Sequence, residues 1–178
     1  MLSEIRAWAQ KAYIEGVNFV AFDVETTGLD PRFDRIVEIG AVKFDKKGII
    51  ARFSTLVNPG IPMPAEAARV NNITDRMLVD KPSLDEVYPD FQLFVRNSVL
   101  TAHNAPFDLS FIKLPNRIID TLILSRELLP GHMSYSLQNL ALDLQLPSVD
   151  AHRAENDARL CMEIFILCLG LTPSPLLK

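Results

Sequence analysis

Two carboxylates, Asp23 and Glu25, lie two positions apart at the end of an apolar segment, NFVAFDV (residues 18–24). Side chains two apart on a β-strand leave the sheet on the same face, so a strand here would direct both acids into one place. Burying two like charges together is unfavourable because of desolvation and repulsion, and a divalent cation would resolve that conflict. In the alternative reading, the acids lie beyond the strand in solvent and residues 26–30 form an ordinary turn. The pair alone leaves both readings open.

A third acid, Asp108, lies in VLTAHNAPFDLSFI (residues 99–112), a pattern that predicts a strand running into a helix. An acid in the first turn of a helix is favoured by the helix dipole, which is the ordinary structural explanation for an isolated Asp. His103 and Asn104 precede it at the carboxyl end of the predicted strand, where open α/β sheets place their ligands. This segment is therefore a second candidate for a site.

The third polar segment is AHRAENDA (residues 151–158), with His152 and Asp157 at the start of the predicted final helix. Alanines on either side would let this helix approach another element closely, so that both polar side chains could reach past it. An isolated His or Asp here is usually a polar residue of a helix start. Three such segments in one chain favour a common site.

Several elements must position these segments. Runs of apolar and β-branched residues predict strands over residues 18–24, 35–44, 49–57, 98–102 and 118–121. Helical periodicity predicts helices over residues 4–15, 83–95, 103–114, 122–128, 137–146 and 153–169. Strands come first and then alternate with helices, which predicts a mixed sheet covered by helices.

The expected boundaries follow from capping and turn residues. Ser3 is expected to cap the first helix, and Ser83 with Glu86 forms a capping box for the second, although Pro89 argues against the continuity of that helix. Pro115 is expected to end the helix that carries Asp108.

The composition predicts one globular domain over residues 1–178, with residues 1–17 as an N-terminal helical extension and residues 171–178 as a disordered tail. Cys161 and Cys168 are too few for a disulfide framework and read as apolar packers in a reducing compartment. The longest apolar run near the C-terminus, residues 164–171, is too short to cross a bilayer, and the first 12 residues are too polar for a secretory signal. These features predict a cytoplasmic protein without a membrane partner.

The net charge of −4 and the isoelectric point of about 5.4 predict no broad basic surface for nucleic acid. Four of the 22 acidic residues are the candidate site residues named above, and the remaining 18 equal the 18 lysines and arginines. Away from the candidate site the chain is thus formally neutral.

The segments FDVETTGL, DRIVEIGAV, HNAPFDLSF, YSLQNLA and AHRAENDA together resemble the three motifs of the DEDDh 3′–5′ exonucleases, in family order and with about the family spacing. The similarity covers residues 19–169 and is greatest to the DnaQ-like, proofreading type associated with bacterial DNA polymerase III. The resemblance implies an α/β, ribonuclease H-like fold. That fold has a five-stranded mixed sheet flanked by helices, in which the first three strands are antiparallel.

By this resemblance four acids would bind two divalent ions, Mg²⁺ or Mn²⁺, and His152 would be the general base. The four acids are Asp23, Glu25, Asp108 and Asp157. A phosphodiester resists attack by an anionic nucleophile, and two metal ions can activate a water and stabilise the leaving 3′ oxygen. Oxygen ligands suit Mg²⁺, and the lack of a cysteine ligand points away from zinc.

End specificity requires groups that recognise a terminal nucleotide. The resemblance places the Thr26 backbone and Glu25 at the 3′ hydroxyl and Leu29 as a wedge beside the terminal base. Asn104 and Phe107 would line the pocket, where stacking of a base is tolerant of sequence. Core packing is an equal alternative for Leu29 and for Phe107.

Two departures limit this transfer. The family's VHGIT-like segment places a histidine near the substrate, whereas VNNIT here puts Asn71 at that position and Asn72 where glycine is usual. The stretch from Asp108 to the strand at residues 118–121 is also shorter than usual. Asn71 is thus a candidate substrate contact of altered chemistry.

The sequence therefore predicts a metal-dependent 3′–5′ exonuclease that releases nucleoside 5′-monophosphates from single-stranded or frayed DNA during proofreading or repair. Its expected partners are a single-stranded DNA 3′ end and, as a further candidate, a DNA polymerase subunit. One alternative is an exoribonuclease of the RNase T or oligoribonuclease kind, since no residue reads the 2′ hydroxyl unambiguously. Another is a non-catalytic module of a replication complex, against which the five filled catalytic positions argue.

Overall fold

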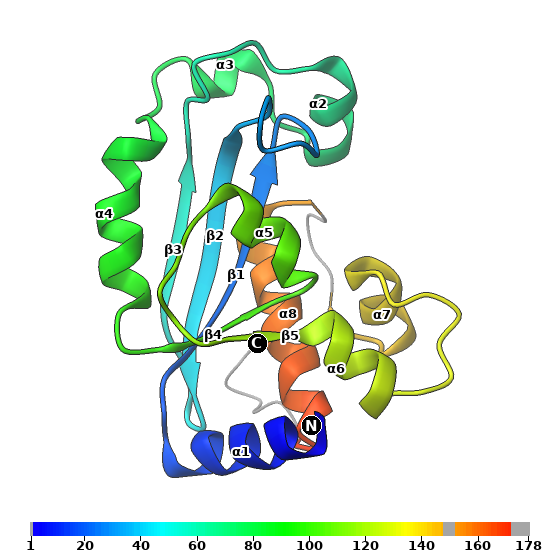
Figure 1. Cartoon of the computed structure of the whole chain (residues 1–178). Coiled ribbons are helices and arrows are strands. Elements are labelled where there is room, and N and C mark those ends of the chain that lie inside the picture. The colour runs from blue at the N-terminus through cyan, green and yellow to red at the C-terminus, as the bar shows by residue number, and fades with distance from the viewer. Residues whose placement is uncertain (1, 148–151, 172–178) are drawn as a thin grey trace.

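A five-stranded mixed sheet forms the centre of the computed structural model, which describes residues 2–147 and 152–171 (Figure 1). The strand order is β3-β2-β1-β4-β5, with β1 antiparallel to β2 and parallel to β4. The strands are β1 (Phe19–Thr26), β2 (Ile36–Asp45), β3 (Gly48–Leu56), β4 (Val99–Ala102) and β5 (Ile118–Asp120). The predicted mixed sheet, with its first three strands antiparallel, is confirmed.

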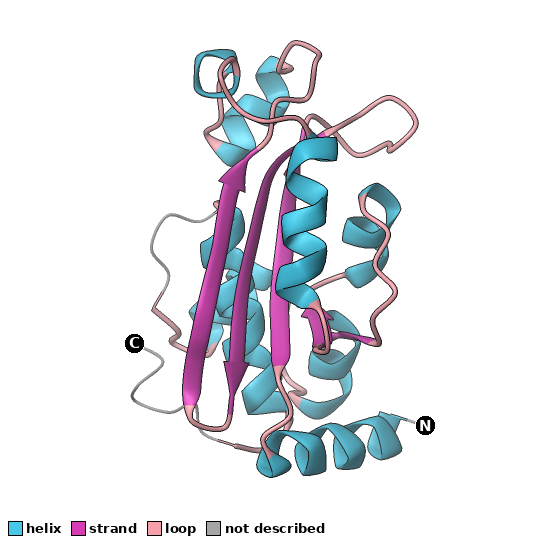
Figure 2. Ribbon diagram, turned by 90° about the vertical axis from the view of Figure 1, so that its left-hand side faces the viewer, coloured by secondary structure: helices cyan, strands magenta, loops and turns pink. Residues whose placement is uncertain are grey.

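Helices cover both faces of this sheet (Figures 1 and 2). Those described are α1 (Leu2–Glu15), α2 (Ala65–Asn71), α3 (Asp75–Leu78), α4 (Leu84–Val95), α5 (Ala105–Phe111), α6 (Thr121–Leu128), α7 (Leu137–Asp143) and α8 (Ala154–Cys168). Helix α8 lies against β1 and β2 on one face, and α4 packs on the other. Helix α1 runs across the end of the sheet at which β1 begins (Figure 1).

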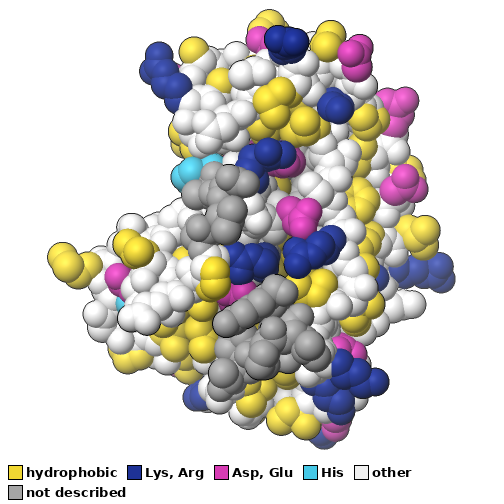
Figure 3. All heavy atoms as spheres, turned by 180° about the vertical axis from the view of Figure 1, so that it is seen from behind, with side chains coloured by type: hydrophobic (Ala, Val, Ile, Leu, Met, Phe, Trp, Pro, Cys, Tyr) yellow, Lys and Arg dark blue, Asp and Glu magenta, His cyan; other side chains and the backbone are white. Residues whose placement is uncertain are grey.

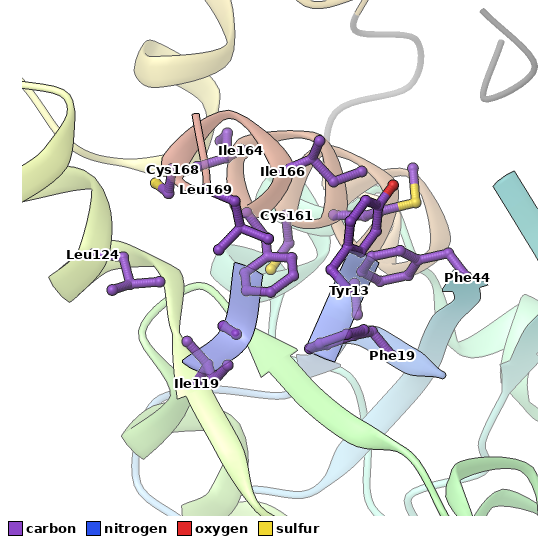
Figure 4. Packing of buried hydrophobic residues seen from close by; sticks show 14 of the residues in the cluster. Tyr13, Phe19, Phe44, Ile119, Leu124, Cys161, Ile164, Ile166, Cys168 and Leu169 are labelled. Carbon is purple, nitrogen blue, oxygen red and sulfur yellow. The ribbon is translucent and has the colours of Figure 1, made fainter. Parts of the chain in front are cut away.

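Strand β1 is buried on both faces, and its side chains alternate between two apolar cores. Phe19 and Ala21 belong to the core beneath α8, where Phe19 stacks on Phe44 (Figure 4). Phe19 also contacts Phe165. Val20 and Phe22 belong to the core beneath α4. By this alternation the next residues on the α8 face are acids, so one layer is apolar at one end and acidic at the other.

The first strand is longer than predicted. It continues to Thr26, which pairs with Ile36, and Glu25 pairs with Glu38 of β2. Asp23 and Glu25 therefore lie within a paired strand and on its α8 face, which excludes the reading that they follow it in solvent.

Several predicted boundaries were wrong. Helix α1 already includes Leu2, so Ser3 lies inside the helix and not at its cap. Helix α4 runs through Pro89, with the Ser83–Glu86 capping box present as predicted. Helix α5 ends at Phe111, before Pro115 can act, because Ile112 is extended. Helices α2 and α3 were not among the predicted helices, since seven and four residues are too short for a periodic signal.

No helix in the described ranges is long and apolar enough to span a membrane. Of the predicted tail, residues 172–178 lie outside the described residues. The face seen in Figure 3 places acidic and basic side chains next to each other, without a broad basic patch, in keeping with the near-neutral charge balance.

Candidate active site

The three polar segments meet in one cleft of about 890 Å³ at the carboxyl end of β1. Its walls come from β1, the start of α5, the loop before α7 and the start of α8. They include Asp23, Glu25, His103, Asn104, Phe107, Arg126, Gln138, His152 and Asp157. The sequence segments that suggested chemistry separately are therefore parts of one surface.

Asp108 is tied directly to β1. The parallel pairing of β1 with β4 covers residues 19–21 alone, so the edge of β1 facing α5 is open from residue 22 onward. The Val24 backbone N–H, which lies between the two acids of β1, donates a hydrogen bond of 3.1 Å to Asp108 Oδ1. Asp108 is 2% exposed. The hydrogen bond therefore gives the N–H of the unpaired sheet edge an acceptor and the buried carboxylate a donor.

The start of α5 sets this geometry. Asn104 precedes the helix in a left-handed conformation (φ 71°, ψ 51°), which Asn tolerates better than most residues. Its backbone N–H donates to Asp120 Oδ1 at 3.2 Å, a contact that links the turn after β4 to the end of β5. Asn104 thereby remains exposed at the cleft while Asp108, one turn later, points inward.

The start of helix α8 places Asp157 and His152 at the cleft. Asp157 is buried and accepts a hydrogen bond of 2.7 Å from Gln138 Nε2 of α7. His152 is exposed and has a positive φ of 61° just before the helix. Glu25, His152 and Asp157 each offer a ligand atom within 4.8 Å of the other two, so this trio could hold a metal ion.

The carboxylates are crowded enough to disfavour their charged forms. Burial, and then the negative charges of Asp108 and Glu25, raise the pKa of Asp23 well above its usual value. Burial, followed by the charge of Asp157, raises the pKa of Glu25 to about 8. Burial also raises the pKa of Asp108 to about 8 and raises the pKa of Asp157. Such a cluster fits the chemistry of a cation site.

Two histidines line the cleft, and only one is available for proton transfer. Both ring nitrogens of His103 are engaged, Nδ1 with Thr121 Oγ1 at 3.0 Å and Nε2 with the Tyr135 carbonyl at 2.8 Å. Burial lowers the pKa of His103, which favours its neutral form. His103 therefore braces the loop before α7, and His152 is the better candidate for a base.

A second, more apolar cleft of about 350 Å³ adjoins the first and shares Val24, Glu25 and Phe107 with it. Leu29, 83% exposed, and the exposed Val70 of α2 are among its apolar lining residues. This cleft also holds Thr26 and Asn71. All five predicted substrate residues thus line one or both clefts.

Asn71 makes internal contacts in this second cleft. It is 2% exposed, its Nδ2 donates to the Thr26 carbonyl at 3.3 Å, and its Oδ1 accepts from the Ile73 backbone N–H at 3.1 Å. Thr26 Oγ1 in turn donates to the Gly28 carbonyl at 2.6 Å. These contacts hold α2 beside the end of β1, and they leave Asn71 little capacity for a ligand.

The chain is similar to known proteins over most of its length. A family model described as Exonuclease matches residues 20–165, which include every residue of the two clefts named above. The chain belongs to the exonuclease family.

Relatives of this exonuclease include the DNA polymerase III subunit epsilon of Treponema pallidum, 49% identical over 85% of this chain and 76% of that protein. A DNA polymerase III PolC-type of Caldanaerobacter subterraneus is 43% identical over 89% of this chain, which spans 12% of that much longer protein. Among solved structures, exonuclease X in complex with 5′ overhanging duplex DNA is 31% identical, with a TM-score of 0.73 over 86% of this chain and 94% of that one. The ribonuclease H-like fold predicted from the motifs is confirmed by this similarity.

The residues that were not predicted from the sequence include two that line the acidic cleft, Gln138 and Arg126, and one that is buried beside it, Glu38. Gln138 holds Asp157, Arg126 lines the cleft near His103, and the buried Glu38 faces Glu25 across the sheet. Glu38 had a sequence signal, because it is a lone acid within the apolar run of a predicted strand. Gln138 and Arg126 had none, since polar residues on exposed helix faces are ordinary.

Proposed function

We propose that this exonuclease is a metal-dependent 3′–5′ exodeoxyribonuclease that shortens single-stranded or frayed DNA and releases nucleoside 5′-monophosphates in proofreading or repair. The observation that carries the proposal is the convergence of Asp23, Glu25, Asp157 and His152 on one cleft, with Asp108 bound to β1 directly behind it. An apolar cleft that shares Glu25 and Phe107 lies next to it. The Treponema relative, named as a polymerase III subunit, favours proofreading and DNA.

The donor set fits a pair of hard divalent cations, Mg²⁺ or Mn²⁺. Asp23, Glu25, Asp108 and Asp157 supply oxygen atoms, and their crowding raises their pKa values in a way that bound cations would reverse. When bound by these residues, such ions would activate a water as nucleophile and stabilise the charge of the leaving 3′ oxygen.

Residues of the chain transfer the proton and bind the terminal nucleotide. A neutral ring nitrogen of His152 takes the proton from the attacking water. Glu25 and the Thr26 backbone meet the terminal 3′ hydroxyl. Leu29 and Phe107 enclose the terminal base from two sides, and Asn104 contacts the nucleotide from the start of α5.

The apolar cleft supports recognition of an unpaired end. Much of its lining is apolar and offers contact to any base, which is tolerant of sequence. The proposal extends to one exonuclease domain over residues 1–178 that works in the cytoplasm, with a DNA polymerase subunit as partner. An exoribonuclease of the RNase T kind is the competing candidate.

Digestion of matched 5′-labelled DNA and RNA oligonucleotides, single-stranded and duplex, with Mg²⁺, Mn²⁺ or EDTA, tests this proposal. We expect stepwise loss from the 3′ end of single-stranded DNA, none in EDTA, and slower digestion of a blunt duplex. A circular single strand should survive. Faster digestion of RNA would favour the competing candidate, and cleavage of the circle would overturn end recognition.

A further inference from the structure

A fifth acid lies beside the four carboxylates and has a different partner. Glu38 of β2 is 1% exposed and pairs with Glu25 across the antiparallel ladder, so both side chains lie on the α8 face. Arg153 Nε lies 3.1 Å from both Glu38 carboxylate oxygens, and its Nη2 lies 2.7 Å from Oε1. The charge of Glu38 is thus paired with a guanidinium in a forked arrangement.

The same carboxylate also fixes the beginning of α8. Its Oε2 accepts a hydrogen bond of 3.1 Å from the backbone N–H of Ala154, the first residue of that helix. With three donor atoms on its two oxygens, Glu38 is a poor candidate for a further metal ligand.

The helix start is also pressed against β2. A Cβ atom at Gly40 would lie 2.0 Å from the Glu155 backbone nitrogen, so a glycine is required for this approach. Glu38 and Gly40 therefore define where the first turn of α8 can lie. Asp157, in that first turn, accepts its bond from Gln138.

His152 is covalently next to the paired arginine. Its positive φ of 61° is a costly conformation for a residue with a Cβ, and it persists where neighbouring contacts hold it. Arg153 supplies such a contact directly after the turn. The exposed imidazole can then stay within 4.8 Å of the ligand atoms of Glu25 and Asp157.

We propose that the Glu38–Arg153 pair is a positioning device for His152, separate from the metal ligands. The inference rests on the proposed function, because it assigns His152 the proton transfer. Loss of the pair lets the turn at His152 relax, so proton transfer slows while the acids that bind metal and the cleft that binds the base remain in place.

A second ion pair at the same helix start offers a matched control. Arg52 Nη1 of β3 lies 2.9 Å from Glu155 Oε1, and both side chains are partly exposed. It links the sheet to the first turn of α8 as Arg153 does, but through one contact and without His152 as its neighbour. Arg52→Gln thus tests whether loss of any ion pair that anchors the start of α8 would slow proton transfer by His152.

The kinetic test compares Arg153→Gln, Arg52→Gln and the wild type on a 5′-labelled single-stranded oligonucleotide with Mn²⁺. We expect kcat of Arg153→Gln to fall about 10- to 100-fold, the range typical of groups that orient a reacting residue. KM and the Mn²⁺ dissociation constant should stay within about threefold, and Arg52→Gln should change kcat less than about threefold. An unchanged kcat, an equal loss in Arg52→Gln, or a parallel loss of Mn²⁺ affinity would each overturn the proposal.

Removing one partner also leaves Glu38 buried and unpaired, which by itself destabilises a fold. The double variant Glu38→Gln/Arg153→Met removes both charges and should recover most of the melting temperature. Its kcat should remain low, because the fork is still missing. Recovery of kcat together with the melting temperature would show that the pair serves the fold alone.

NMR of the imidazole separates this inference from the proposed function. The chain has three histidines, so His152 can be assigned by the loss of its signal in His152→Gln. Its ring signal should shift or broaden in Arg153→Gln and remain unchanged in Arg52→Gln. If the wild type digests no nucleic acid, the proposed function fails, and this signal still decides whether the pair positions His152.

Discussion

The two adjoining clefts of this exonuclease are built in opposite ways. The acidic cleft and the carboxylate behind it are held by hydrogen bonds from neighbouring elements, such as that of Asp157 with Gln138 and that of the buried Asp108 with the edge of β1. The apolar cleft has a wall, Leu29, that projects 83% exposed from a loop. Phe107 belongs to both.

The difference reflects what each cleft must do. Charges that share one site need fixed distances, and fixed distances require elements that hold each group from several sides. A surface that accepts any terminal base needs apolar area and few directional contacts. Substitutions in the acidic cleft should therefore change the chemistry strongly, and those in the apolar cleft should change binding modestly.

The largest expected effect is that of Asp23→Asn. The amide keeps the shape but removes a charge, so activity should fall about 10³-fold or more, since each metal contributes several kcal/mol. The same change relieves repulsion, so the metal-free protein should melt at a higher temperature than the wild type. Calorimetry with Mn²⁺, an exonuclease assay and a melting curve measure the three quantities. A lower melting temperature with unaltered Mn²⁺ affinity would show that Asp23 serves the fold alone.

The next effect is that of His152→Ala. Loss of the base should lower kcat by roughly 10²- to 10⁴-fold. Mn²⁺ binding and the affinity for a single-stranded oligonucleotide should be retained, because His152 is exposed and the four acids are untouched. His132→Ala, at a histidine paired with Asp143 outside both clefts, is the control and should keep full turnover. Near wild-type activity of His152→Ala would assign proton transfer to another group.

The acidic cleft should also give the metal-free protein an unusual pH dependence. Its acids have pKa values raised in the folded state, to about 8 for Glu25 and for Asp108. Their contribution to stability is therefore complete below the unfolded value of about 4 and is lost as the pH rises toward 8. In EDTA the melting temperature should fall between pH 5.5 and 8, and Mn²⁺ should raise it more at pH 8. A metal-free protein that is more stable at pH 8 would contradict the crowding of these acids.

The apolar cleft should respond less. Leu29→Ala and Phe107→Ala should each raise KM for a single-stranded oligonucleotide by roughly tenfold, since contact with one base is worth about 1–3 kcal/mol, and should leave kcat within a few-fold. Phe33→Ala removes another exposed apolar side chain of the same loop, one that lines neither cleft, and should have no effect. Equal losses in all three variants would show that the loop acts as a whole.

The contrast also explains what the sequence could predict. Asp23 and Glu25 stand out because two acids in an apolar strand are costly, and such cost implies a compensating function. The mixed sheet could be predicted from runs of apolar and β-branched residues and from the order of strands and helices along the chain. The contact between Asp108 and Val24 could not be predicted, because it depends on β4 ending its pairing at residue 101. The Glu38–Arg153 pair likewise depends on where α8 crosses β2.

The sequence suggested one role for Asn71, and its environment in the fold indicates another. Its place in VNNIT suggested a contact to the last nucleotide, since the related segment has a histidine there. The fold buries it instead between Thr26 and Ile73, and a buried amide with both ends bonded to main chain is typical of a brace. The residue type at this position is the same for a substrate contact and for a brace, so the sequence does not distinguish the two roles.

The smallest expected effect on activity is that of Asn71→Ala. The change leaves the buried Ile73 N–H without its acceptor, which costs about 1–3 kcal/mol. In a protein of this size that corresponds to a fall in melting temperature of roughly 2–4 °C per kcal/mol. The kcat/KM value at 25 °C should stay within about threefold, because both ends of the amide are already bonded to main chain. Asn72→Ala, at the exposed neighbour with φ 57°, is the control for backbone strain at this turn. A tenfold loss of kcat/KM with an unchanged melting temperature would show that Asn71 contacts the substrate in the apolar cleft.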